Sequence, residues 1–199
     1  MNHALQRLQS MIFCGEVLPG EHIRQQELAG ELGLSRVPLR EALNVLARSG
    51  LLIHRPHQGY YVAKRAPHER AQLRRMLELL EGELIDTLEW PDESVLAQLT
   101  DINDRMAAYS RAETWHPIIE LNREFHLVIF SLSPHTLILD QVRRVWDLAA
   151  PYLYEKLVQP ATCLRNVQEH AELIEVLRAR DRAACQRIMN AHRLNTERA

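Results

Sequence analysis

The chain has 199 residues, of which 46% are hydrophobic and 25% charged, with 7 glycines and 9 prolines. This composition excludes a disordered chain and is typical of a globular protein that buries a core. Three cysteines without a C-x-x-C pair argue against a disulfide framework, and no stretch approaches the roughly 18 apolar residues of a membrane span, so we expect a soluble cytoplasmic protein with no membrane partner.

The net charge of −2 is distributed unevenly along the chain. Residues 1–66 carry eight Lys and Arg against five Glu, a net charge of +3, which leaves −5 for residues 67–199. The overall charge therefore does not exclude a nucleic-acid partner for the N-terminal part.

The first 50 residues predict three helices. Leu5, Leu8 and Ile12 recur at helical spacing and indicate a helix over 3–14. A short second helix over 27–32 is broken at Gly33. A third helix runs to about Ser49; Ser35 can cap it, and Pro38 lies in its first turn.

After Gly50 the pattern changes to two short β-prone runs, residues 51–55 and 60–63. The segment Pro56-His57-Gln58-Gly59 separates them, as expected of a hairpin. Three helices followed by such a hairpin predict a winged helix-turn-helix domain over residues 1–66.

The remainder, residues 67–199, predicts an all-helical bundle, so the expected fold class is mainly α. Proline-containing or polar breaks separate six helical segments. We place them at 68–89, 92–111, 116–132, 134–158, 162–179 and 181–196.

Arg36 and Arg40 lie four residues apart at the start of the third predicted helix, so both side chains project from one face. In a helix-turn-helix this face enters the major groove, where a guanidinium can bind O6 and N7 of guanine in bidentate fashion. Elsewhere such a pair would be an ordinary solvated helix face. The surrounding motif favours DNA recognition here.

That motif extends over nearly all of residues 10–63 and closely resembles the GntR family of bacterial regulators. It comprises Ile12-x-x-Gly15, Leu18-Pro19-Gly20, Leu28-Ala29, Leu32-Gly33-Leu34-Ser35-Arg36-x-Pro38-Leu39-Arg40-Glu41-Ala42-Leu43, Leu46, Gly50-Leu51 and Gly59-x-x-Val62. The resemblance implies that Arg36 and Arg40 read guanines, that Gly59 lets the wing approach the minor groove, and that Ser35 and Arg24 help to hold phosphates. Gly59 can equally be a simple turn glycine.

A single winged helix-turn-helix domain, which we call the head, has a charge of +3 and would bind DNA weakly. We therefore expect a homodimer on a palindromic operator.

Three histidines stand out in the C-terminal part. Asn122 and His126 are four residues apart on one predicted helix, and His170 and His192 lie on the last two. In a helical bundle, side chains from three facing helices can converge in the core. A lone histidine on such a helix is more often a structural residue than a ligand.

The surrounding residues resemble the FCD domain, the ligand-binding domain of the FadR subfamily, in its six-helix variant. They are Asn122-Arg123-Glu124-Phe125-His126, then Glu169-His170-x-x-Leu173-Ile174-x-Val176-Leu177, Asp181, Cys185, Met189 and His192. The match is strong at the C-terminal end, moderate at 118–130 and weak over 68–115. The resemblance implies a divalent metal, held by Asn122, His126, His170 and His192, with Zn or Ni suited to the three imidazoles.

Two positions depart from this family. Asn122 stands where an aspartate is common, which replaces an anionic ligand by a neutral one. Leu77 stands where many members carry an arginine for an effector carboxylate. Candidates to replace that arginine are Arg74, Arg75, Arg123 and Arg143.

We therefore predict a transcriptional regulator, not an enzyme, whose operator affinity responds to a small organic acid bound beside the metal. We expect residues 67–199 to bind the effector and to form the dimer. One alternative keeps DNA binding but has a structural or empty metal site, which leaves the helical domain as a dimerisation module. A metal-dependent hydrolase is a further alternative, because three histidines also describe catalytic zinc sites. Glu124 and Glu169, the acids next to proposed ligands, are expected to point away from the metal, which disfavours a hydrolase.

Overall fold

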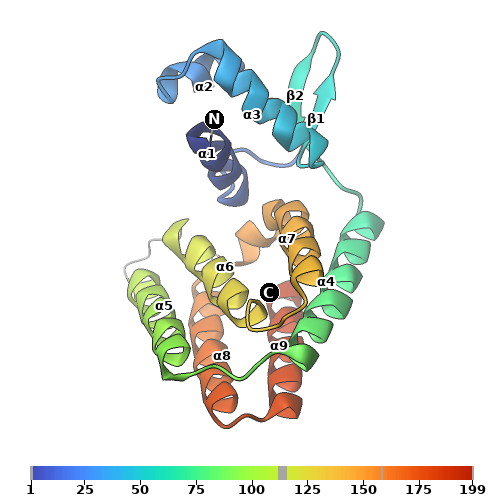
Figure 1. The fold of residues 1–199 in the computed structure, drawn as a ribbon. Helices are drawn as coiled ribbons and strands as arrows, with labels where there is room; N and C mark the ends of the chain where they lie inside the picture. Colours follow the sequence, from blue (N-terminus) through green and yellow to red (C-terminus); the bar gives the residue numbers. More distant parts are fainter. Residues whose placement is uncertain (1, 112–115, 158, 199) are drawn as a thin grey trace. The chain divides into compact units, whose positions relative to one another are not determined.

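The fold is described from a computed structural model, which covers residues 2–111, 116–157 and 159–198. In these residues the chain forms nine helices and one two-stranded sheet (Figure 1). This confirms the expected fold class. The chain divides into two compact units: the first is Met1–Leu73 with Trp146–Tyr152, and the second is Arg74–Val145 with Leu153–Ala199. The domain boundary predicted between residues 66 and 67 remains a prediction.

The first unit begins with three helices and a hairpin. In chain order these are α1 (Asn2–Phe13), α2 (Gln25–Glu31), α3 (Arg36–Arg48), β1 (Leu52–Arg55) and β2 (Gly59–Val62). All five elements agree with the sequence prediction to within about two residues. The order is that of a winged helix-turn-helix.

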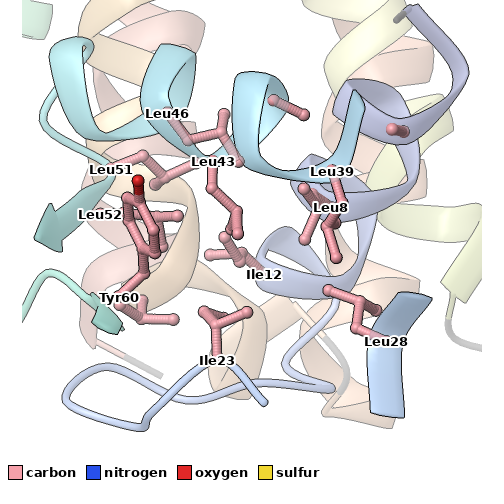
Figure 2. Packing of buried hydrophobic residues seen from close by; sticks show 13 residues of the cluster. Leu8, Ile12, Ile23, Leu28, Leu39, Leu43, Leu46, Leu51, Leu52 and Tyr60 are labelled. Atoms are coloured by element: carbon pink, nitrogen blue, oxygen red, sulfur yellow. The ribbon is translucent and has the colours of Figure 1, made fainter. Parts of the chain in front are cut away.

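The core of this unit forms where α1 and α3 face each other (Figure 2). Leu8 and Ile12 of α1 pack with Leu39 and Leu43 of α3, and all four are nearly inaccessible to solvent. Burial of each such side chain contributes about 1.5–3 kcal/mol to folding. The apolar positions recur every three to four residues, so the buried face of α3 leaves its opposite face to solvent.

Strand β2 of the hairpin is paired along both of its edges. Antiparallel pairing places Leu52 opposite Val62 and Arg55 opposite Gly59. The preceding segment 20–23 also pairs with β2, since Ile23 N–H donates to the carbonyl of Tyr60 at 2.8 Å. No pattern in the sequence predicted this second line of backbone hydrogen bonds, which ties the hairpin to the chain before α2.

Among the described residues, six helices follow the hairpin, as predicted. They are α4 (Pro67–Thr87), α5 (Glu93–Arg111), α6 (His116–Phe130), α7 (Thr136–Leu157), α8 (Pro160–Arg178) and α9 (Arg182–Arg198). Both α4 and α7 contribute residues to both units. Within the second unit, α8 and α9 run side by side in opposite directions, and α5 lies along α6 and α8 (Figure 1).

The three cysteines are buried and none forms a disulfide. Burial raises the pKa of the Cys163 and Cys185 thiols to about 11. Both therefore act as small apolar core residues and not as reactive thiolates. Separately, none of the described helices is long and apolar enough to cross a membrane.

Candidate DNA-reading surface and histidine site

The first turn of α3 presents two arginines to solvent. Arg36 and Arg40 are exposed, whereas Leu39 and Leu43 on the other side of the helix are buried in the core. Neither arginine forms an ion pair with a described residue, so both guanidinium groups are available to an external partner. Arg48, at the far end of α3, is also exposed.

Ser35 occupies the N-cap position of α3, but its side chain makes no capping hydrogen bond. The prediction that Ser35 caps this helix is therefore wrong. A cap normally accepts from the backbone N–H of the second or third helical residue, and the third residue here is Pro38, which has no N–H. Arg24, also predicted to hold phosphate, is exposed and lies 3.4 Å from Glu27.

Gly59 begins β2 with a φ of +88°, a conformation that favours glycine. A Cβ atom at this position would lie 2.9 Å from Nε2 of His22. His57, in the turn of the hairpin, also has a positive φ of 61°. The structure thus provides a packing reason for Gly59, and its predicted approach to the minor groove stays a prediction.

Three histidines meet in the interior of the second unit. His126 of α6, His170 of α8 and His192 of α9 are 3%, 1% and 7% exposed. Nε2 of His126 lies 3.1 Å from Nε2 of His192 and 3.3 Å from Nε2 of His170. Each histidine lies on the buried face of its helix, and the ring of Phe125 stacks on His170 at a centroid distance of 3.9 Å. We call these three residues the histidine triad.

Burial lowers the pKa of His126 well below its usual value of 6.5, and the neighbouring His192 and Arg193 lower it further. Burial likewise lowers the pKa of His170, with His126 and His192 as further causes. Both imidazoles are therefore neutral at neutral pH. A neutral imidazole has one nitrogen lone pair with which to accept a proton or bind a metal ion.

The geometry of the histidine triad fits a metal ion. A metal–nitrogen distance of about 2.0–2.1 Å places adjacent ligand nitrogens roughly 2.9–3.4 Å apart, in octahedral or tetrahedral coordination. The two Nε2 separations fall in this range. One ligand atom from each of the three histidines lies within 4.8 Å of the others. Three buried imidazoles of this kind can hold a divalent cation.

An amide lies one helical turn before two of these histidines. Asn122 precedes His126 on α6, and Asn166 precedes His170 on α8; both are buried, and Oδ1 of each lacks a hydrogen-bond partner among the described residues. A buried carbonyl oxygen without a donor costs about 1–3 kcal/mol. Each oxygen is thus suited to a cation or to a hydrogen-bond donor on a ligand. Asn166 was not recognised in the sequence.

Glu169 makes a contact that the sequence did not reveal. It is predicted to point away from the metal because it neighbours His170 on the helix, and this stays a prediction. Nδ1 of His192 donates a hydrogen bond to Oε2 of Glu169 at 2.6 Å. Helical spacing relates Glu169 only to residues of α8, whereas this contact comes from the antiparallel helix α9. Glu124, in contrast, is exposed.

A buried ion pair next to the triad was also missed. Arg193, which follows His192, donates to Oε2 of Glu81 at 2.6 Å, and the two side chains are 16% and 5% exposed. This pair links α4 to α9. Leu77, one turn before Glu81, is buried, as its apolar character requires.

The four arginines predicted to bind an effector carboxylate lie on three helices. Arg74 and Arg75 of α4 and Arg143 of α7 are exposed, and Arg123 of α6 is half-buried. Arg75 lies 2.7 Å from Glu78, and Arg143 lies 3.1 Å from Asp140. Their role toward an effector remains a prediction.

Comparison with known protein families matches two models to this chain. Residues 1–62 match the model described as bacterial regulatory proteins, gntR family, and residues 69–195 match the FCD domain. Among curated proteins, the chain is 28% identical to the HTH-type transcriptional regulator McbR of Escherichia coli (strain K12), over 89% of this chain and 82% of that protein. It is 30% identical to the uncharacterized HTH-type transcriptional regulator YdhC of Bacillus subtilis (strain 168), over 94% and 84%.

Solved structures show the same fold. That of E. coli McbR/YncC aligns with a TM-score of 0.86 at 24% identity, covering 96% of this chain and 92% of that one. A putative GntR regulator from Rhodococcus sp. RHA1 aligns with a TM-score of 0.81 at 20% identity, covering 98% and 94%. The family matches and the curated relatives confirm the expectation of a regulator and not an enzyme. The chain belongs to the GntR family of bacterial transcriptional regulators, with an FCD domain as its C-terminal part.

Proposed function

We propose that this protein is a one-component regulator of the FadR subfamily, in which a small organic acid bound at the histidine triad changes the affinity for operator DNA. The observation that carries the proposal is the convergence of three buried imidazoles within the FCD domain. They provide a site for Zn or Ni, and open coordination positions on such an ion can take a carboxylate. Asn122 is the proposed fourth ligand.

In the proposed DNA complex, Arg36 and Arg40 bind guanine edges in the major groove. Their exposure on the first turn of α3 supports this role. Ser35 has no capping bond, so its hydroxyl is available to a phosphate, and we assign the same partner to Arg24. Gly59 brings the wing backbone to the minor groove. Two heads on a palindrome, in a homodimer, supply the affinity that one head lacks.

The effector is a small organic acid whose carboxylate binds the metal ion, assisted by Arg74, Arg75, Arg123 or Arg143. One observation favours a second candidate function, a regulator with a structural or empty metal site and no effector. Asn122 is a neutral ligand where an aspartate would be anionic, and loss of that charge weakens binding of a dication. The two candidates differ in whether operator affinity responds to an acid.

The DNA-reading part is tested with three single variants of the full chain. Arg36→Ala and Arg40→Ala should each lower affinity for a selected operator by about 5- to 150-fold, since a bidentate guanine contact gives about 1–3 kcal/mol of discrimination. Arg48→Ala is the matched control, because it removes the same charge from the exposed C-terminal end of α3. Fluorescence anisotropy against operator and scrambled duplexes is the measurement.

Retention of operator preference in both the Arg36→Ala and Arg40→Ala variants would contradict the assignment. A loss of the same size in Arg48→Ala would show that total charge, and not base recognition, determines binding. Circular dichroism of each variant checks that the fold is intact.

A further inference from the structure

A carboxylate stands directly behind one histidine of the triad. Oε2 of Glu169 accepts the hydrogen bond from Nδ1 of His192 at 2.6 Å, and the Glu169 side chain is 14% exposed. Because a carboxylate only accepts, Nδ1 of His192 carries the proton in this bond, and in a neutral ring the lone pair is then on Nε2. Nε2 is the atom that lies 3.1 Å from Nε2 of His126, so the lone pair belongs to the nitrogen at the centre of the triad.

The ligand atoms at the centre of the triad come from neutral groups. Imidazole and amide ligands carry no charge, and Asn122 stands where an aspartate would supply one. A divalent ion held by such a set is stabilised by a negative charge nearby, which offsets part of its own charge. Glu169 does not bind the ion itself in this arrangement. Its carboxylate is hydrogen-bonded to His192, a proposed ligand of the ion. Carboxylate–histidine–metal chains of this kind orient the ring and increase its basicity.

Arg165 and Arg193 also lie close to these groups. Nε of Arg165, one turn before Glu169, is 3.9 Å from Oε1 of Glu169, and the Arg165 side chain is 38% exposed. The contact of Glu169 with His192 is shorter and more buried. Arg193 donates to Glu81 through two of its nitrogens. One carboxylate oxygen of Glu169 thus lies at ion-pair distance from Arg165, and the other accepts the hydrogen bond from His192.

We propose that Glu169 is a positioning residue of the metal site: it orients His192 toward the ion and supplies the negative charge that Asn122 lacks. This inference rests on the proposed function, which places a divalent ion at the triad. A purely structural role is the alternative, in which the bond between Glu169 and His192 only joins α8 to α9. The two roles differ in whether loss of the charge acts on metal affinity or only on folding stability.

The test uses the full chain without DNA and measures the dissociation constants of Zn²⁺ and Ni²⁺ by competition with a chromophoric chelator. Glu169→Gln keeps the shape and an accepting oxygen but removes the charge. We expect it to lower the affinity for both ions by about 10- to 100-fold. Glu172→Gln is the matched control, because Glu172 is exposed on the same helix, and it should leave both constants unchanged. Glu169→Asp, which restores a carboxylate, should recover part of the affinity.

A double-mutant cycle tests the compensation directly. Asn122→Asp should tighten metal binding. In the Asn122→Asp variant, Glu169→Gln should weaken metal binding less than it does in the natural sequence, because the aspartate supplies the charge. A second readout is the ¹H–¹⁵N spectrum of the imidazoles, which should show the His192 proton on Nδ1 in the natural protein.

The outcomes separate this inference from the proposed function. If the natural protein binds metal tightly and Glu169→Gln has the same dissociation constant, the proposed role of Glu169 is wrong, whereas the proposed metal site is retained. Absence of Zn²⁺ and Ni²⁺ binding by the natural protein overturns both. If Glu169→Gln lowers the thermal stability of the chelated protein but not its metal affinity, Glu169 is a structural link and the inference is wrong.

Discussion

At the scale of single residues, two buried histidines of the second unit have a lowered affinity for protons. Burial and mutual repulsion lower the pKa of His126 and His170, so the folded chain binds no proton at these rings near neutral pH. In the unfolded chain the same rings bind protons below about pH 6.5. Folding therefore competes with protonation at the triad.

The sign of this effect predicts acid sensitivity. Below about pH 6.5 the unfolded state binds more protons than the folded state. The free energy of unfolding of the metal-free protein, kept in EDTA, should therefore fall as the pH is lowered. The expected slope is up to about 1.4 kcal/mol per pH unit for each histidine. Urea unfolding in EDTA at pH 7.5, 6.0 and 5.0 measures it, and His126→Gln should reduce the slope. Equal stability at all three pH values would show that these rings bind protons equally in the folded and the unfolded chain, and would contradict the lowered pKa values.

Individual residues also show how much of the candidate site could be predicted from the sequence. Asn122, His126, His170 and His192 could be named because their motif resembles a family. The contact of Glu169 with His192 was missed because the two residues lie on different helices, and helical spacing carries no information about a neighbouring helix. Asn166 gave no signal, because an isolated buried amide is indistinguishable in sequence from an exposed one.

At the scale of elements, the helices could be predicted to within a few residues because their apolar positions recur at a period near 3.6. The hairpin was predicted from β-prone runs around a turn. The pairing of segment 20–23 with β2 was not, since Glu21-His22-Ile23 has too few residues to show an alternating pattern. This pairing brings His22 against Gly59 and gives the wing a second support.

We predict that alanine substitutions at Gly59 and Gly30 change the free energy of unfolding in opposite directions. Gly59→Ala should lower the free energy of unfolding by about 1–3 kcal/mol, because φ is positive and His22 must move. Gly30→Ala, inside α2 with no atom within 4 Å of the added Cβ, should raise it by about 0.5–1 kcal/mol. Chemical denaturation of both variants and of His22→Ala/Gly59→Ala measures the difference. No recovery in the double variant would exclude His22 as the obstacle.

At the scale of the whole molecule, one chain carries an exposed pair of arginines in a GntR-type head and a buried set of histidines in an FCD domain. If an acid bound at the histidines changes operator affinity by some factor, operator binding must change the affinity for the acid by the same factor. Coupling of 1–3 kcal/mol, typical of allosteric proteins, corresponds to a 5- to 150-fold change. The sequence predicted both sites but carries no pattern from which their coupling can be derived.

The most direct test of the proposed function is the dissociation constant for a selected operator, measured by fluorescence anisotropy on the zinc-loaded full chain. Propionate, succinate and citrate are added singly, and His170→Gln is the control. We predict that at least one acid changes the constant fivefold or more in the natural protein and leaves that of His170→Gln unchanged. A constant that stays the same with every acid, in zinc and in EDTA, would contradict the proposal and favour a helical domain that serves only for dimerisation.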